Sequence, residues 1–203
     1  AFTRGPMHRW SSSSGSTLLE MLFVSALAAT LGGIAVPQTL AALDDIRAAG
    51  AARYVSGRLQ RARMEAVLRS AEVAIKYTQT AGGYSYAVYV DGNRNGVRGA
   101  DITTNVDRQI LPDEKLTDFF KGVDFGALPS LPPVDSGGTA PGSDPIRLGS
   151  SDMASFSARG TSSTGTLYIR GQGSSQYAVR LYGETGKTRI LKFDPRLRRW
   201  NPL

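Results

Sequence analysis

The chain has 203 residues, with 24 lysines and arginines against 17 aspartates and glutamates, and a formal net charge of +7. This positive excess favours anionic partners. There is no cysteine and only one histidine, His8, which excludes Cys-His and Ser-His-Asp nucleophiles and His/Cys zinc sites from the rest of the chain. An enzyme would have to rely on carboxylates or lysine, so we expect a protein that is not an enzyme.

An apolar segment dominates the N-terminal part of the chain. It extends over residues 18–36, and Glu20 is its only charged residue. The segment is long enough to cross a bilayer as a helix. A lone carboxylate in lipid is costly unless it finds a cationic partner, so we interpret Glu20 as functional. Residues 1–15 precede this segment and have a net positive charge. This charge predicts an exported C-terminal domain on a single membrane span.

Four residues around this segment have a spacing that is found in a known family: Gly15, Ser16, Glu20 and Pro37. They resemble the signal and N-terminal helix of type IV pilins and type II secretion pseudopilins. The resemblance implies that residues 1–15 are a leader, which a prepilin peptidase removes between Gly15 and Ser16. The new Ser16 amine would then be methylated and would meet Glu20 of an adjacent subunit. Ser16 stands where the family usually has Phe or Met. The alternative is an ordinary signal anchor with one stray glutamate.

One long helix is predicted from about Thr17 to about Ser70. Residues 16–37 form its transmembrane part, and residues 38–70 form an amphipathic part in which apolar residues recur at helical spacing. Pro37 should kink the helix, because it removes one backbone donor and crowds the preceding turn. We expect the amphipathic part to cover a sheet.

Residues 71–203 are predicted to form a β-rich globular domain. Alternating apolar residues predict two strands joined as a hairpin, a shorter strand after them, and three more strands near the C-terminus. These strands cover residues 72–78, 84–90, 108–111, 166–170, 176–182 and 187–193. Residues 128–145, rich in Pro, Gly, Ser and Asp, are predicted to be a long loop. The predicted fold class is α+β, with a long helix packed on a mainly antiparallel sheet.

Three further segments resemble the GspH/FimT group of minor pseudopilins and minor pilins. Residues 61–70 lead directly into a strand, and residues 91–98 follow the second strand. In the third, Gly186-Lys187-Thr188-Arg189 occupies the place of a Gly-Arg-x-Arg segment in that group. The resemblance implies a pilin-like fold and a subunit that assembles with other subunits.

A calcium site is one interpretation of the loop after the second predicted strand. Asp91, Asn93, Asn95 and Asp101 offer hard oxygen ligands at nearly the spacing of a calcium loop. The alternative is an Asn/Gly-rich turn, because asparagine tolerates the left-handed backbone conformation. We predict no other cofactor.

The C-terminal region is the most basic part of the chain. Its possible DNA-binding residues are Gly186, Lys187, Arg189, Lys192, Arg196, Arg198, Arg199 and Trp200. Cationic side chains beside an aromatic ring suit a phosphate backbone and a stacked base. Some members of the resembled group bind DNA through the matching segment during natural transformation. The alternatives are a solvated basic edge or a contact with an acidic neighbouring subunit.

Taken together, the sequence predicts a minor pilin or pseudopilin subunit of a type II secretion pseudopilus or a type IV pilus. Its predicted location is the bacterial inner membrane, with the C-terminal domain in the periplasm and later in the filament. The predicted partners are the prepilin peptidase, other pilin subunits, the inner membrane, and DNA or secreted cargo. The alternatives are a DNA-binding minor pilin and a membrane-anchored periplasmic enzyme.

Overall fold

The computed structural model describes residues 17–203, so Gly15, Ser16 and the predicted leader lie outside the described residues. The first element, α1 (Leu18–Arg69), is one uninterrupted helix of 52 residues with Pro37 inside it. It begins and ends within one residue of the prediction. The chain divides into two compact units after Leu40. The half of α1 that follows residue 40 therefore belongs to the globular unit, and the two units are described separately below.

The globular unit contains two antiparallel sheets. The first has the strand order β3-β2-β1-β6, and the second has the order β10-β9-β8-β7-β4, with β5 also paired to β7. The strands of the first sheet are β1 (Val73–Thr80), β2 (Gly83–Val90), β3 (Arg108–Lys115) and β6 (Met153–Phe156). Those of the second are β4 (Asp124–Phe125), β5 (Ile146–Arg147), β7 (Gly165–Arg170), β8 (Gln176–Tyr182), β9 (Lys187–Asp194) and β10 (Arg199–Pro202). Two short helices, α2 (Gly99–Thr103) and α3 (Leu116–Phe119), lie in the connections.

The α+β prediction is confirmed, and so are the β1–β2 hairpin and the strands β7, β8 and β9. Two details differ from the prediction. The third strand extends to Lys115 rather than ending at 111, and the strands form two sheets rather than one. The short elements β4, β5, β6, β10, α2 and α3 were not predicted. Each of them has only two to five residues, which is too short for periodicity to distinguish them from loops.

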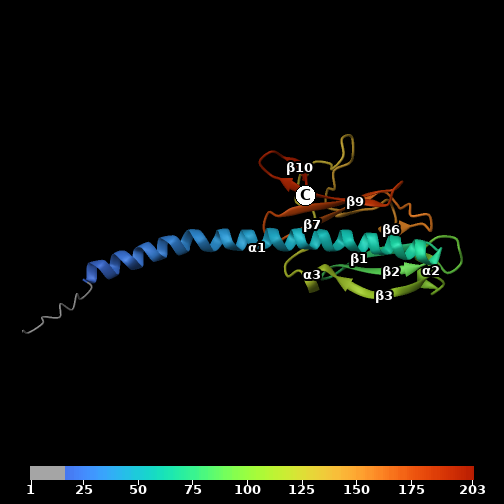
Figure 1. Cartoon of the computed structure of the whole chain (residues 1–203), viewed down its shortest axis with the longest axis horizontal. Coiled ribbons are helices and arrows are strands. Elements are labelled where there is room, and N and C mark those ends of the chain that lie inside the picture. The colour runs from blue at the N-terminus through green and yellow to red at the C-terminus, as the bar shows by residue number, and fades with distance from the viewer. Residues whose placement is uncertain (1–16) are drawn as a thin grey trace, which may run out of the picture. The chain divides into compact units, whose positions relative to one another are not determined.

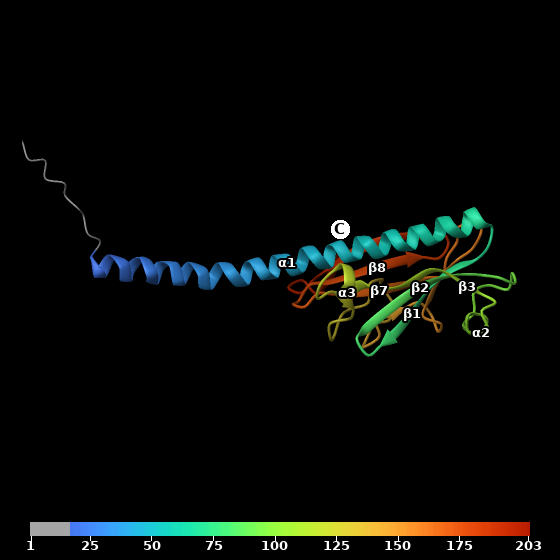
Figure 2. The same ribbon diagram turned by 90° about the horizontal axis from the view of Figure 1, so that it is seen from below.

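The second half of α1 packs on both sheets through its small side chains. Ala48, Ala51, Ala52 and Ala66 are fully buried, and they let the helix approach the sheets closely. Val55 and Leu59 fill the space between these alanines and belong to the same apolar cluster as residues of both sheets. Figure 1 shows this half of the helix with β1, β2 and β3 on one side and β7 and β9 on the other, and Figure 2 shows the strands running below it.

A second apolar cluster lies on the face of the β7–β9 sheet that is turned away from α1. Its buried members are Leu131, Tyr168, Ala178, Leu191 and Phe193, with Trp200 packed against them. Leu131 comes from residues 128–145, which have no helix or strand, as predicted. This loop therefore covers part of the outer sheet face.

Candidate functional site

The N-terminal end of α1 is capped by a side chain next to the predicted processing site. The backbone N–H of Glu20 donates a hydrogen bond to Oγ1 of Thr17 at 3.3 Å. Thr17-Leu-Leu-Glu20 thus has the spacing of a capping box. The Glu20 carboxylate lies in the first turn, where a negative charge is favoured by the helix dipole. Sequence reasoning missed the role of Thr17, although the threonine–glutamate spacing would have indicated it.

The hydroxyl groups in the apolar half of α1 are hydrogen-bonded within the helix. Ser25, Thr30 and Thr39 each donate to the backbone carbonyl four residues earlier, at 2.8, 2.8 and 2.9 Å. All residues from Leu18 to Leu40 are exposed, and this helix is long and apolar enough to cross a membrane. Glu20 therefore remains the only charged group on an otherwise lipid-compatible surface.

Two adjacent aspartates fasten the second half of α1 to the β7–β9 sheet. Asp44 accepts hydrogen bonds from the backbone N–H groups of Gln172 and Gly173, at 2.8 and 3.1 Å. Asp45 accepts from the hydroxyl of Tyr177 at 2.9 Å and from Nζ of Lys192 at 2.7 Å. Lys192, one of the predicted DNA-binding residues, therefore faces α1 and pairs with a carboxylate.

The predicted basic residues are divided between the two faces of this sheet. Side chains alternate along a strand, so Lys187 and Arg189 lie on the outer face and Lys192 lies on the face toward α1. Arg199 of β10 lies opposite Asp194 of β9 in the strand register, so it shares the sheet face of Lys192. Lys187 and Arg189 are exposed, as are Arg196, Arg198 and Arg199 at and after the β9–β10 turn. The structure thus brings Lys187 and Arg189 together and places the turn arginines at the other end of β9.

Gly186 and Trp200 have structural contacts in this region. Gly186 has φ +60°, and a Cβ added there would meet the carbonyl oxygen of Gly160 at 2.6 Å. The Trp200 ring packs against Tyr168 and Phe193, with centroid distances of 5.8 and 5.3 Å. Its Nε1 donates to the carbonyl of Pro132 at 3.0 Å. Trp200 therefore holds the long loop rather than presenting a free ring.

The outer face also contains basic residues that sequence reasoning missed. Strand pairing aligns Arg189 with Arg180, Arg180 with Thr166, and Thr166 with Arg147. These cross-strand neighbours share one face. Nη2 of Arg180 is 2.6 Å from a carboxylate oxygen of Asp135 in the long loop, so part of the positive charge is neutralised there. No sequence signal reveals this row, because it depends on strand register.

A polar network joins α1 to the β3 end of the other sheet. Glu114 accepts hydrogen bonds from the hydroxyls of Tyr54 and Tyr86, both at 3.0 Å, and pairs with Arg58. Nε of Arg58 also donates to the Tyr54 hydroxyl at 3.1 Å. Burial alone would raise the pKa of Glu114, but the hydrogen bonds from Arg58 and the two tyrosines hold that pKa below its ordinary value.

The predicted calcium loop is organised by hydrogen bonds. The carboxylate of Asp91 accepts from the backbone N–H groups of Asn93, Arg94 and Gly96 at 2.8–3.0 Å. Nδ2 of Asn95 and Nδ2 of Asn93 donate to Oδ2 of Asp101 at 3.1 and 3.4 Å. Within the described residues, no group of three or more His, Cys, Asp or Glu could hold a metal ion. The four predicted residues do lie together, in an arrangement that closes a turn.

Comparison with known proteins decides the family. The family described as "Type II transport protein GspH" matches residues 51–185, which is more than half of the chain. The chain belongs to the GspH family. This GspH-family chain is also similar to "Pilin-like protein PilA1" of Thermus thermophilus, with 39% identity over 82 residues. That match covers 40% of this chain and 50% of the relative, so the chain spans about half the length of the curated relative. No solved structure matches the chain.

The region that matches GspH includes the amphipathic end of α1, the strands β1 to β8, and the long loop at residues 128–145. It begins after the apolar half of α1 and ends before β9. The family assignment therefore depends on the globular unit, whereas Glu20 and the basic residues from Lys187 onward lie outside the matched region.

Proposed function

We propose that this GspH-family chain is a minor pilin-type subunit, cut after Gly15 and held in the inner membrane by residues 18–36. It then enters a type II secretion pseudopilus or a type IV pilus. The observation that supports this most directly is the exposed apolar half of α1, in which Glu20 is the only charge and the hydroxyl groups are bonded internally.

Assembly would be driven by burial of this apolar surface among neighbouring subunits. Glu20 sets the axial position, because a carboxylate moved from lipid headgroups into an apolar filament is costly unless it meets the Ser16 amine of the next subunit. A subunit out of position leaves that charge unpaired. The globular unit remains outside the membrane and needs no catalytic group for this role.

The test distinguishes the pairing of Glu20 with the Ser16 amine of the next subunit from the capping of α1 by Thr17. Glu20→Ala keeps the backbone N–H that bonds to Thr17, so the chain should still be exported and cleaved but should not enter filaments. Thr17→Ala is the matched control, because it removes the cap and keeps the carboxylate. Its cost is expected to be about 1 kcal/mol of helix stability, with incorporation retained. Subunits are counted in sheared filaments by immunoblot, and normal incorporation of Glu20→Ala would disprove the pairing role. Mass analysis of the mature chain tests cleavage at Gly15 and methylation at Ser16.

A DNA-binding role in natural transformation is the second candidate. It is favoured by the exposed Lys187 and Arg189 on the outer sheet face. Each basic side chain that neutralises a phosphate contributes about 0.9 to the slope of log affinity against log salt for duplex DNA. The double variant Lys187→Gln/Arg189→Gln should therefore flatten the slope by roughly 2, while Lys192→Gln, which faces α1, should leave it unchanged. An unchanged slope in the double variant would remove this candidate.

A further inference from the structure

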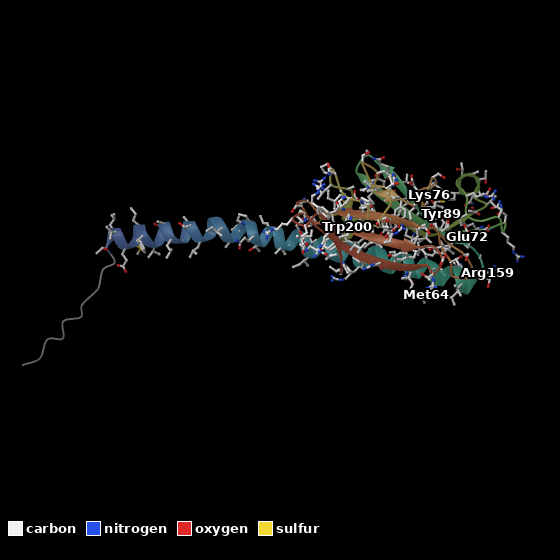
Figure 3. All side chains as sticks on the ribbon, turned by 90° about the horizontal axis from the view of Figure 1, so that it is seen from above. Met64, Glu72, Lys76, Tyr89, Arg159 and Trp200 are labelled. Atoms are coloured by element: carbon white, nitrogen blue, oxygen red, sulfur yellow. The ribbon has the colours of Figure 1, made fainter. Side chains whose placement is uncertain are left out.

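The second half of α1 has an outer face of exposed residues, interrupted at Gly50, where the ring of Phe120 would lie 3.0 Å from an added Cβ. Residues on this face recur at intervals of three, four or seven positions, which places them on one side of the helix. They are Ile46, Arg53, Gly57, Arg61, Met64 and Leu68, all of them exposed, and we call them the outer helix face. Ile46, Met64 and Leu68 are 67%, 63% and 76% exposed. Figure 3 shows Met64 at the margin of the molecule, on the side of α1 away from the strands.

The charge on this face is positive and unpaired. Within residues 17–203, no carboxylate oxygen lies within 4.0 Å of Arg53 or Arg61. Other arginines of the same helix are bonded: Arg58 to Glu114, Arg63 to the carbonyl of Gly160, and Arg69 to Glu65. The outer helix face therefore has two cations at its centre, and neither forms an ion pair within the described residues.

The acids of this half of α1 are used elsewhere. Asp44 and Asp45 bind the β7–β9 sheet, and Glu65 pairs with Arg69. No acidic residue belongs to the outer helix face itself. Two copies that met through this face would bring four guanidinium groups together, and juxtaposed like charges oppose association. The charge pattern therefore disfavours a second copy as the occupant.

The shape of the face suits a helix. Gly57 lies one turn from both Arg53 and Arg61, is exposed, and has no atom within 4 Å of the position where a Cβ would stand. A small residue at this position lets another backbone approach closely. The two arginines are eight residues apart, which is about 12 Å along a helix axis. Carboxylates seven or eight positions apart on a partner helix would match them.

We propose that the outer helix face docks a helix from a different subunit, with acidic residues opposite Arg53 and Arg61 and apolar residues opposite Met64 and Leu68. This inference rests on the proposed function and deepens it, because membrane-anchored subunits present their helices side by side. It adds that this chain selects a partner of opposite charge rather than another copy of itself.

The cysteine-free chain allows a direct test by disulfide cross-linking. Gly57→Cys is introduced into two full-length copies with different tags, expressed together in membranes. One copy keeps the native arginines, and the other also has Arg53→Glu and Arg61→Glu, so it supplies an acidic helix. After mild oxidation, the mixed pair should cross-link roughly tenfold more than the native–native pair, because several exposed ion pairs act together. Raising the salt concentration should reduce this preference.

Two controls keep the result interpretable. Arg53→Gln/Arg61→Gln is a neutral variant, and its yield with the native copy should lie between the two charged cases. Gly82→Cys, placed where a Cβ also meets no atom within 4 Å but outside α1, should show no dependence on the arginine substitutions. Equal yields for native–native and mixed pairs would overturn the choice of an acidic partner, and no cross-link in any pairing would overturn docking at this face. Cleavage after Gly15 and filament incorporation are measured separately, so failure of the proposed function would be distinguishable.

Discussion

Removal of the Glu114 carboxylate should destabilise the globular unit by about 3 kcal/mol, because several donors share this one acceptor. Glu114 and Arg58 have side chains that are only 15% and 19% exposed, and Tyr54 and Tyr86 also donate to the carboxylate. In Glu114→Ala, the guanidinium of Arg58 and both tyrosine hydroxyls lose this acceptor. A hydrogen bond to a charged group contributes about 1.5–3 kcal/mol, and three bonds to one carboxylate are not additive.

The effect of Glu114 should depend on pH in a defined direction. The folded-state pKa lies below the ordinary value, which is about 4.3 in model peptides. The charged form of Glu114 therefore stabilises the folded state at pH values above the ordinary pKa. This contribution is lost as the pH falls through the folded-state pKa. Glu114→Gln keeps an acceptor without the charge, so it should cost about 1.5 kcal/mol at pH 7 and less once the pH falls below the ordinary pKa.

Urea unfolding of the detergent-solubilised chain, followed by near-ultraviolet circular dichroism, measures these differences. Glu65→Gln is the matched control, because Glu65 pairs with Arg69 on the helix surface with side chains 29% and 48% exposed. An exposed pair of this kind contributes less than about 0.5 kcal/mol. If the gap between native and Glu114→Gln were the same at pH 7 and pH 3, the carboxylate would not be the source of the stabilisation.

Two further predictions concern the core and the Asp91 loop. Leu59→Ala should lower the free energy of unfolding by about 3 kcal/mol, because Leu59 is fully buried between helix and sheets and its removal leaves a cavity; a loss below about 1 kcal/mol in the same urea assay would contradict the packing. Asp91→Ala should lower the thermal midpoint equally with and without a calcium chelator, because its oxygens accept three backbone N–H groups. A midpoint of the native chain that rises with added calcium would instead support the calcium interpretation.

The sequence predicted the elements whose patterns are long and regular. Val73, Ile75 and Tyr77 alternate along β1 and imply the hairpin. In this hairpin β1 pairs with β2 from Val73 opposite Val90 to Thr80 opposite Gly83. The division into two sheets could not be predicted, because strand β6 pairs with β1 across a large sequence separation and has no distinctive pattern of its own.

Some site residues could likewise be predicted from the sequence, whereas the position of others depends on how the strands pair. Glu20 stood out because it is the only charge in an apolar segment, and the structure leaves it on an exposed helix. The basic C-terminal residues could be found by composition, but the face on which each one lies could not. Lys192 looked equivalent to Lys187 in the sequence, yet Lys192 bonds to Asp45. Arg180 was missed because its neighbour Arg189 comes from another strand.

The position of Asp44 and Asp45 has a mechanical consequence. Any tension that enters the globular unit through residue 41 reaches these two aspartates within the next turn of α1. Their bonds to Gln172, Gly173 and Lys192 then resist sliding of the helix along the β7–β9 sheet. Pulling along the helix axis therefore loads this polar clamp before it loads the buried alanines, and the clamp sets the force at which the helix would begin to peel from its sheet.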